Sequence, residues 1–127
     1  MGQLSKRAES ILRMQKFNRF ACPHCKEPMQ VEKDGRLQCE NRHSFDVAKQ
    51  GYVYMLAKPV NSMYSKDLFD ARHHIITSGL YNRVQQKIAE LIRVDNAKIL
   101  DTGCGEGSHL ARICAQLDGA VGVGIDI

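Results

Sequence analysis

Hydrophobic positions recur at two different spacings in the first half of the 127-residue chain. Apolar residues at helical spacing, with basic residues on the other side, predict an amphipathic helix over residues 4–17. Apolar and polar residues then alternate on either side of Asp34-Gly35, a pair typical of tight turns, so residues 20–45 are expected to form a hairpin. A short extended piece is expected at residues 51–56.

The second half begins after a stretch without periodicity at residues 58–62, which predicts a linker. Helical spacing returns over residues 67–76 and then along one face of a following helix. That face is formed by Leu80, Val84, Ile88, Leu91 and Ile92. From Ala97 onward strands and a helix alternate, which is typical of an α/β domain with a parallel sheet. The expected elements are a strand at 98–100, a helix at 108–117 and a strand at 120–127.

Composition narrows the class of protein. With 43% hydrophobic and 25% charged residues, the chain resembles a soluble globular protein, and it lacks the run of about eighteen apolar residues that a membrane span requires. The basic, polar N-terminus also lacks the apolar stretch of a secretory signal, so we expect a cytoplasmic protein. In that reducing compartment, five cysteines favour metal binding and burial over disulfides.

Positive charge is concentrated at the N-terminus. The formal net charge is +4, and five cations against Glu9 place all of it within residues 1–20. Such a segment fits contact with a polyanion such as RNA, through phosphate attraction and counterion release. A solvated helix face would show the same pattern, so both interpretations stay open. The five cations are Lys6, Arg7, Arg13, Lys16 and Arg19.

Two short clusters of soft ligands predict a metal site. Cys22-Pro-His-Cys25 and, after thirteen intervening residues, Cys39-Glu-Asn-Arg-His43 provide four ligands at the spacing of a tetrahedral zinc centre. A hairpin between the clusters would bring the second beside the first. Because protein ligands would fill all four positions, this zinc is expected to be structural, with metal binding coupled to folding. His24 is a rival ligand, and buried thiols with a surface histidine are the alternative without metal.

A glycine-rich loop, residues 101–107, follows the first predicted strand of the α/β region. Glycines let the backbone approach a ligand and accept positive φ angles, and the amides at the start of the next helix suit a carboxylate or another anion. Asp126 ends the second strand, where it can accept the ribose hydroxyls of an adenosine cofactor. The G-x-G-x-G spacing makes nicotinamide and flavin cofactors second choices, and a tight turn without any ligand is the bland alternative. The candidate cofactor residues here are Asp101, Gly103, Gly105, Glu106, Gly107 and Asp126.

Together these motifs resemble one family, the bacterial 23S ribosomal RNA (guanine-N1)-methyltransferases. The resemblance runs from Phe20 to the end of the chain. Its most specific parts are Cys-Pro-His-Cys, the segment 41–49 leading into Gly51-Tyr-Val, Ala71-Arg72 before Gly79-Leu-Tyr81, and Asp101-Thr-Gly-Cys-Gly-Glu-Gly107.

The resemblance implies an α/β fold in two parts. Residues 1–57 would form a basic helix and a small zinc-ribbon-like domain that helps recognise an rRNA hairpin, followed by a linker at 58–66. Residues 67–127 would begin a doubly wound, Rossmann-like methyltransferase domain that binds S-adenosylmethionine. The family's zinc ligands fall on Cys22, Cys25, Cys39 and His43, and its cofactor contacts on Tyr81, Gly105 and Glu106. Tyr81 also has a bland interpretation, as an aromatic residue that packs at the start of a helix.

Family members continue well beyond Ile127, so the chain is expected to be an N-terminal fragment that is inactive by itself. The reaction expected of the whole protein is methyl transfer from S-adenosylmethionine to N1 of a guanine in a large-subunit rRNA hairpin. Two alternatives remain: a zinc-dependent RNA-binding module without catalytic activity, and a methyltransferase with another substrate. A homodimer is left open as an assembly, and no membrane partner is expected.

Overall fold

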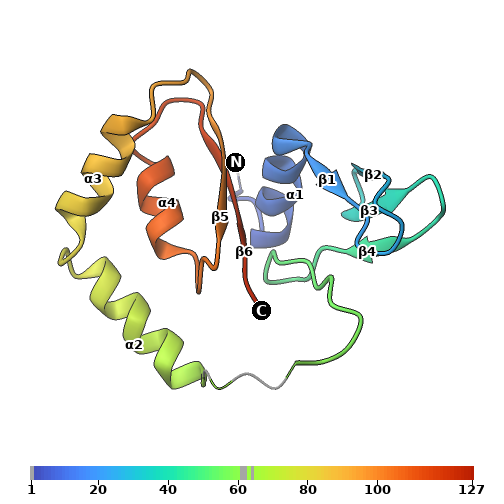
Figure 1. Cartoon of the computed structure of the whole chain (residues 1–127), viewed down its shortest axis with the longest axis horizontal. Helices are drawn as coiled ribbons and strands as arrows, with labels where there is room; N and C mark the ends of the chain where they lie inside the picture. The colour runs from blue at the N-terminus through green and yellow to red at the C-terminus, as the bar shows by residue number, and fades with distance from the viewer. Residues whose placement is uncertain (1, 61–62, 64) are drawn as a thin grey trace. The chain divides into compact units, whose positions relative to one another are not determined.

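The computed structural model describes residues 2–60, 63 and 65–127 and divides the chain into two compact units. The first unit comprises residues 1–59 and the second residues 60–127 (Figure 1). The predicted linker at 58–66 spans this division, and its residues 61, 62 and 64 lie outside the described part.

The first unit opens with the predicted amphipathic helix, α1 (Lys6–Phe17). The helix begins two residues later than expected because Ser5 caps it, its side-chain oxygen accepting a hydrogen bond from the Ala8 amide. It ends at Asn18, which adopts the left-handed conformation with φ 47° and donates its amide to the Met14 carbonyl. Ile11 and Phe17 are the buried residues of this helix.

Four short strands form an antiparallel sheet in the order β1-β2-β3-β4 (Figure 1). The predicted hairpin is confirmed as β2 and β3, with Asp34-Gly35 in the connecting turn and Gly35 at φ 90°. The extended piece expected at 51–56 forms no named strand; it makes one bridge, between Val53 and Val47. The strands are β1 (Phe20–Ala21), β2 (Pro28–Val31), β3 (Arg36–Cys39) and β4 (Ser44–Asp46).

Arg7 joins α1 to this sheet. Its Nε donates to the Val47 carbonyl at 2.9 Å and a terminal nitrogen donates to the Asp34 carbonyl. The guanidinium lies so close to Gly35 that a side chain there would collide with it. Glycine is therefore required at position 35 for two reasons: its φ is positive, and the Arg7 side chain occupies the space that a Cβ would need. Below this contact Ile11, Met29, Leu37 and Val47 pack with two of the cysteines as the core.

The second unit begins with two helices, α2 (Lys66–Thr77) and α3 (Asn82–Leu91). Both were expected, and an apolar face of α3 was identified from the sequence without a prediction of whether that face is buried. Its buried residues are Gln85 and Ala89, because α3 packs on the next helix through a small and a polar side chain. Most of the predicted apolar face stays at the surface: Leu80, Val84, Ile88 and Leu91 are exposed and Ile92 is half-buried.

A strand-helix-strand unit completes the chain: β5 (Lys98–Thr102), α4 (Ser108–Cys114) and β6 (Val121–Ile125). The strands pair in parallel, as predicted, with Lys98 opposite Val121 and Thr102 opposite Ile125. α4 ends three residues earlier than expected, where Ala115 caps it. Gly122 lies under Leu110 of this helix, and a Cβ there would come within 2.9 Å of the Leu110 side chain. Glycine in β6 thus allows the helix to lie close to the strand.

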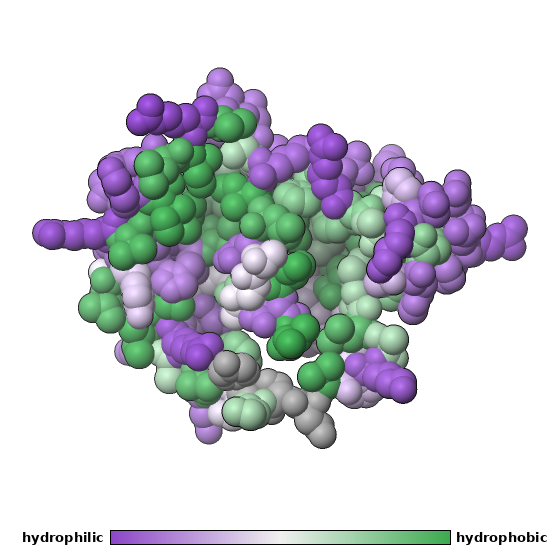
Figure 2. All heavy atoms as spheres, in the orientation of Figure 1, coloured by the Kyte–Doolittle hydropathy of each residue, from purple (hydrophilic) through white to green (hydrophobic). Residues whose placement is uncertain are grey.

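Hydrophobic side chains gather on one visible surface of the second unit, around α3 and the segment that leads to β5 (Figure 2). Leu80 is 71% exposed, Leu91 64% and Val94 70%. Among the described residues, no helix is both long and apolar enough to cross a membrane.

Candidate zinc and cofactor sites

Two matching turns of the first unit hold the predicted zinc ligands. After β1, the Cys22 amide donates to the Glu27 carbonyl and the Lys26 amide returns to the Cys22 carbonyl, both at 2.8 Å. After β3, the Cys39 amide donates to the His43 carbonyl at 3.1 Å and the Arg42 amide to the Cys39 carbonyl at 3.0 Å. Lys26 and Arg42 both adopt positive φ, at 67° and 66°. The two halves of the site are therefore built alike.

The structure brings the four ligand atoms together, all within 4.8 Å of one another. His43 Nδ1 lies 3.4 Å from Cys22 Sγ and 3.5 Å from Cys39 Sγ, and the sulfurs of Cys25 and Cys39 are 3.7 Å apart. A tetrahedral zinc with ordinary bond lengths needs S···N edges of about 3.5 Å and S···S edges of about 3.8 Å. A disulfide would need sulfurs at about 2.05 Å. The arrangement therefore fits a metal ion and not a disulfide.

The sulfur atoms differ in acidity. Hydrogen bonds from the Asn41 side chain and the Glu27 amide lower the pKa of the Cys25 thiol to about 6. Burial raises the pKa of the Cys39 thiol. A thiolate next to a protonated thiol is a pair from which zinc displaces the remaining proton. His24 is placed beside the cluster and not in it, because its ring packs against His43 at 5.1 Å and stacks on Phe45 at 5.7 Å between centroids.

The predicted glycine loop connects β5 to α4 in the second unit. Gly103, Gly105 and Gly107 have φ angles of 75°, 61° and 91°, so each occupies a conformation that other residues adopt only with strain. A Cβ at any of the three would meet nothing within 4 Å. The loop is thus shaped by backbone conformation and has open space on the side where a ligand could approach.

The first half of the loop is hydrogen-bonded to the end of β6 and to Asp126, the residue after it. The amides of Gly103 and Cys104 donate to the Ile125 carbonyl at 2.7 and 3.1 Å, and the Gly105 amide donates to Asp126 Oδ2 at 2.6 Å. Asp126, predicted as the acceptor of ribose hydroxyls, therefore holds a loop amide in this structure. Asp101 lies half-buried in β5, opposite Gly124. Burial, followed by the nearby Asp101 and Asp126 carboxylates, raises the pKa of the Cys104 thiol, which keeps it protonated.

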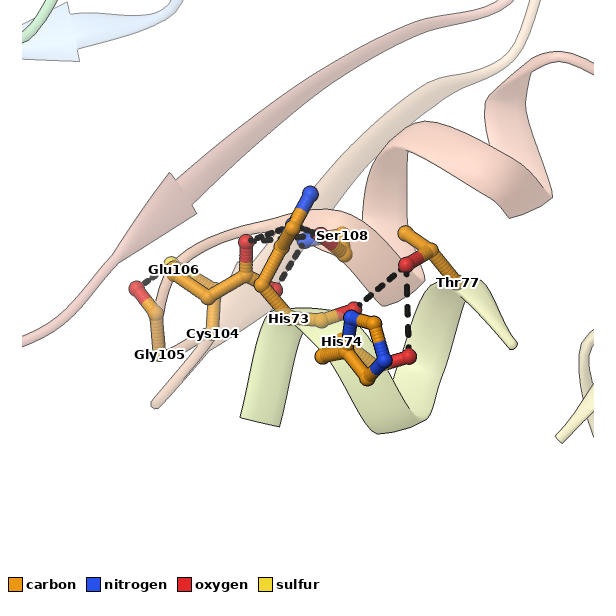
Figure 3. Close-up of polar contacts among 7 residues, drawn as sticks. All are labelled: His73, His74, Thr77, Cys104, Gly105, Glu106 and Ser108. Atoms are coloured by element: carbon orange, nitrogen blue, oxygen red, sulfur yellow. Dashed lines mark hydrogen bonds and ion pairs between the residues drawn. The ribbon is translucent and has the colours of Figure 1, made fainter. Parts of the chain in front are cut away.

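Glu106 turns back onto the start of α4 (Figure 3). Its Oε1 accepts the Ser108 amide at 3.0 Å and its Oε2 accepts the Ser108 hydroxyl at 2.6 Å. His73 of α2 reaches the same group, with Nδ1 2.9 Å from Glu106 Oε2 and 2.7 Å from Ser108 Oγ. Burial raises the pKa of Glu106, but these hydrogen bonds outweigh it and the net pKa is lowered. The helix start that was predicted to face an anionic ligand thus already receives a carboxylate of its own chain.

Tyr81 also contacts α4, through His109. It occupies the position before α3, is 38% exposed, and packs edge-on against His109 of α4 with ring centroids 5.0 Å apart. His109 Nδ1 in turn lies 3.0 Å from Nε2 of the buried Gln85. Both of the interpretations given for Tyr81 remain compatible with this position.

Sequence reasoning missed His73, Ser108 and His109. The motif that includes Ala71-Arg72 stops one residue before His73, and this adjacency was the available indication that His73 belongs to the site. His73 is separated from Glu106 by 33 positions in the chain, so no local pattern links the two. The buried Gln85 was equally hidden, because it is polar and lies beside the apolar face on which the helix prediction rested.

Residues 20–66 match the family described as RlmA, N-terminal, a zinc ribbon. This range contains all four residues of the metal cluster. The family match and the converging ligand atoms support zinc independently, one from the sequence of the domain and the other from its geometry. The first unit is therefore a zinc-ribbon domain.

Three curated proteins are similar to most of the chain. YxjB of Bacillus subtilis (strain 168), whose name assigns it as a 23S rRNA (guanine-N(1)-)-methyltransferase, is 40% identical over 121 residues, which cover 87% of this chain and 43% of YxjB. The 23S rRNA (guanine(748)-N(1))-methyltransferase of Streptomyces fradiae is 36% identical over 112 residues, covering 84% of this chain and 40% of that protein. A protein of Micromonospora griseorubida with the same assignment as YxjB is 26% identical over 127 residues, 84% of this chain and 43% of its own.

The chain thus spans less than half the length of the curated relatives that it matches. The zinc ribbon and the similarity beyond it agree on one family. This chain corresponds to the N-terminal part of the 23S rRNA (guanine-N1)-methyltransferase family, as its motifs predicted.

Proposed function

We propose that this chain is the zinc-ribbon domain and the opening part of a methyltransferase domain from an enzyme that methylates N1 of a guanine in 23S rRNA. The observation that carries the proposal is the similarity to two relatives so named, at 40% and 36% identity over more than four fifths of this chain. The methyl donor is S-adenosylmethionine, the place of action is the cytoplasm, and the target guanine lies in an rRNA hairpin.

The zinc ion would be held by Cys22, Cys25, Cys39 and His43 and would act structurally. With these four ligands the coordination shell is full, which leaves no position for a reacting water. The first unit has few buried apolar side chains, so the metal would supply much of its stability. Its surface suits a polyanion, because residues 1–59 contain eleven Lys and Arg against six Asp and Glu.

The cofactor would bind at the C-terminal end of β5, against the open side of the glycine loop. That edge is where ligands bind in parallel α/β sheets, and the three glycines leave it clear of side chains. Asp101, Glu106 and Asp126 would provide carboxylates there, and Tyr81, which packs on His109 of α4, would provide an aromatic contact. S-adenosylmethionine would supply an already activated methyl group, so the work of this chain's residues is to bind and orient.

Methylation of N1 requires a base that is unpaired or turned out of its helix, since N1 lies on the Watson–Crick edge. We assign no residue of this chain to the target base. The first unit would instead contribute affinity for the surrounding RNA through its positive surface.

A methyl-transfer assay tests the proposal. A protein that contains these 127 residues and extends to the length of the relatives is incubated with labelled S-adenosylmethionine and 23S rRNA that lacks the modification. We expect label at N1 of one guanine, located by a block to primer extension. Label at another atom, or in a different RNA only, would contradict the substrate assignment.

The non-catalytic RNA-binding module is the second candidate, favoured by one observation: in the first unit alone, a closed metal cluster and a positive surface occur together. An RNA that bound this chain tightly, combined with no methylation by the longer protein, would support it.

A further inference from the structure

We propose that His73 of α2 is a positioning residue for the glycine loop: its Nδ1–H donates to the Glu106 carboxylate and so holds the loop in the form that the cofactor meets. The inference rests on the proposed cofactor site. It concerns a residue that lies 33 positions away from Glu106 in the chain and on a different helix.

The protons of the cluster decide which atom donates. The Ser108 hydroxyl has one proton, and at 2.6 Å this proton is donated to Glu106 Oε2. His73 Nδ1 lies 2.9 Å from the same Oε2 and 2.7 Å from Ser108 Oγ. If Nδ1 were unprotonated, its lone pair would face the lone pairs of two oxygens at hydrogen-bond distance. A protonated Nδ1 satisfies both contacts, so the ring carries its proton on this nitrogen.

The contact fixes Glu106 at a place where the loop becomes a helix. One carboxylate oxygen accepts the Ser108 amide and the other accepts Ser108 and His73, so three groups restrain it. Gly107 is the residue before α4 and has positive φ, a conformation that glycine adopts readily but that other residues adopt only with strain. His73 therefore adds a contact from α2 at the end of the loop that is not bonded to β6. The lowered pKa of Glu106 agrees with a carboxylate that stays ionised in this cluster.

The neighbouring histidine of α2, His74, does not share the contact that His73 makes with Glu106. His74 comes next in α2, and its backbone carbonyl accepts a hydrogen bond from the Thr77 hydroxyl (Figure 3) and another from the Ser78 amide. Its side chain is exposed and belongs to no contact with Glu106 that the structure describes. His74→Ala is therefore a matched control for His73→Ala, with the same residue type, helix and exposure class.

The experiment uses the full 127-residue chain loaded with zinc. The ¹⁵N resonances of the histidine rings at pH 7 report which nitrogen of His73 is protonated. We expect Nδ1–H, in contrast to the Nε2–H form that free neutral histidine prefers. An unprotonated Nδ1 would overturn the proposal without reference to any cofactor.

Backbone amide resonances of the loop give the second measurement. His73→Ala should shift the Ser108 and Gly107 amides and weaken S-adenosylmethionine binding about threefold to tenfold, the range expected for one hydrogen bond to a carboxylate at a partly exposed site. His73→Asn, whose side-chain amide can donate from nearly the position of Nδ1, should restore most of both effects. His74→Ala should cause neither.

Loop amides that respond equally to His73→Ala and His74→Ala would overturn the positioning role. A protonated Nδ1 in the wild-type chain, together with loop amides that shift in His73→Ala and not in His74→Ala, would support the contact before any ligand is added. In that case, cofactor binding that is unchanged by His73→Ala would contradict only the part of the proposal that links the contact to the cofactor. Failure of the parent enzyme to use S-adenosylmethionine would instead refute the proposed function.

Discussion

The two units reach a folded state by different means. The first has a contiguous core of Ile11, Met29, Leu37 and Val47, and this core includes two residues of the metal cluster, Cys22 and Cys39. The second leaves large apolar side chains at its surface, among them Leu80 and Leu91. Its sheet has two parallel strands, an arrangement that proteins normally bury on both faces.

This difference teaches where stability comes from in each half. In the first unit the metal fastens two turns whose residues are already close, so a small core is sufficient. In the second unit α3 leaves several large apolar side chains exposed, so the packing of this unit depends on the contacts that α3 makes with α4. The first unit should thus depend on zinc and the second on packing.

Replacing one ligand is expected to have the largest effect. Cys39→Ser removes a thiolate from the cluster and should release the zinc and unfold residues 1–59, because metal binding supplies folding free energy of several kcal/mol or more. Elemental analysis and the amide spectrum of the first unit measure this. Cys104→Ser, in the second unit, is the control that should keep one zinc per chain. Full zinc content in Cys39→Ser would show that the ligand set is wrong.

A steric change in the second unit should cause an intermediate loss of stability and no change in zinc content. At Gly122 a Cβ would lie 2.8 Å from Cys114 Sγ and 2.9 Å from Leu110, so Gly122→Ala should destabilise the β5-α4-β6 unit by about 1–3 kcal/mol. Hydrogen exchange of the β5 amides measures the loss. Gly103→Ala meets no neighbour within 4 Å, and its strained φ should cost about 1–2 kcal/mol. A zinc-binding defect in Gly122→Ala would mean that the units do not fold separately.

The smallest effect is expected from Glu106→Gln and depends on pH. Because the folded-state pKa of Glu106 is lowered, its ionised form stabilises the fold; this contribution is present above the ordinary value of 4.5 and is lost as pH falls through the folded value. At pH 7 the variant should lose about 1 kcal/mol or less, since solvent screens a partly exposed group. In acid its unfolding should match the wild type, provided that the comparison follows second-unit amides. If the difference in unfolding free energy between wild type and variant grew as pH fell, the ionised form of Glu106 would not be the stabilising one.

Much of the fold was predictable because its signals are local. The amphipathic periodicity of α1, the Asp34-Gly35 turn and the alternation from Ala97 onward each depend on a few consecutive residues, whereas the cap at Ser5, which shortens α1, was missed. The pairing of two cysteine clusters was also predictable, since ligand spacing and a hairpin together place four atoms at one point.

The remaining features depend on contacts between distant segments. Which side of α3 is buried is decided by α4, where Arg112 Nε donates to Gln85 Oε1 at 3.1 Å, and hydrophobic periodicity contains no information on such a pair. The contact between His73 and Glu106 arises because α2 and α4 pack together. The cofactor residues stay a prediction, because their geometry is compatible with a ligand without requiring one.

The brace between Arg7 and the hairpin also limits how the N-terminal helix can act on nucleic acid. A guanidinium whose Nε and terminal nitrogen donate to the carbonyls of Val47 and Asp34 is already anchored and cannot follow a moving phosphate group. A backbone of phosphates that passes along α1 would meet the exposed cations, such as Lys6 and Arg13, first. The number of salt ions that RNA gives up on binding should therefore be smaller than the charge count of the helix suggests.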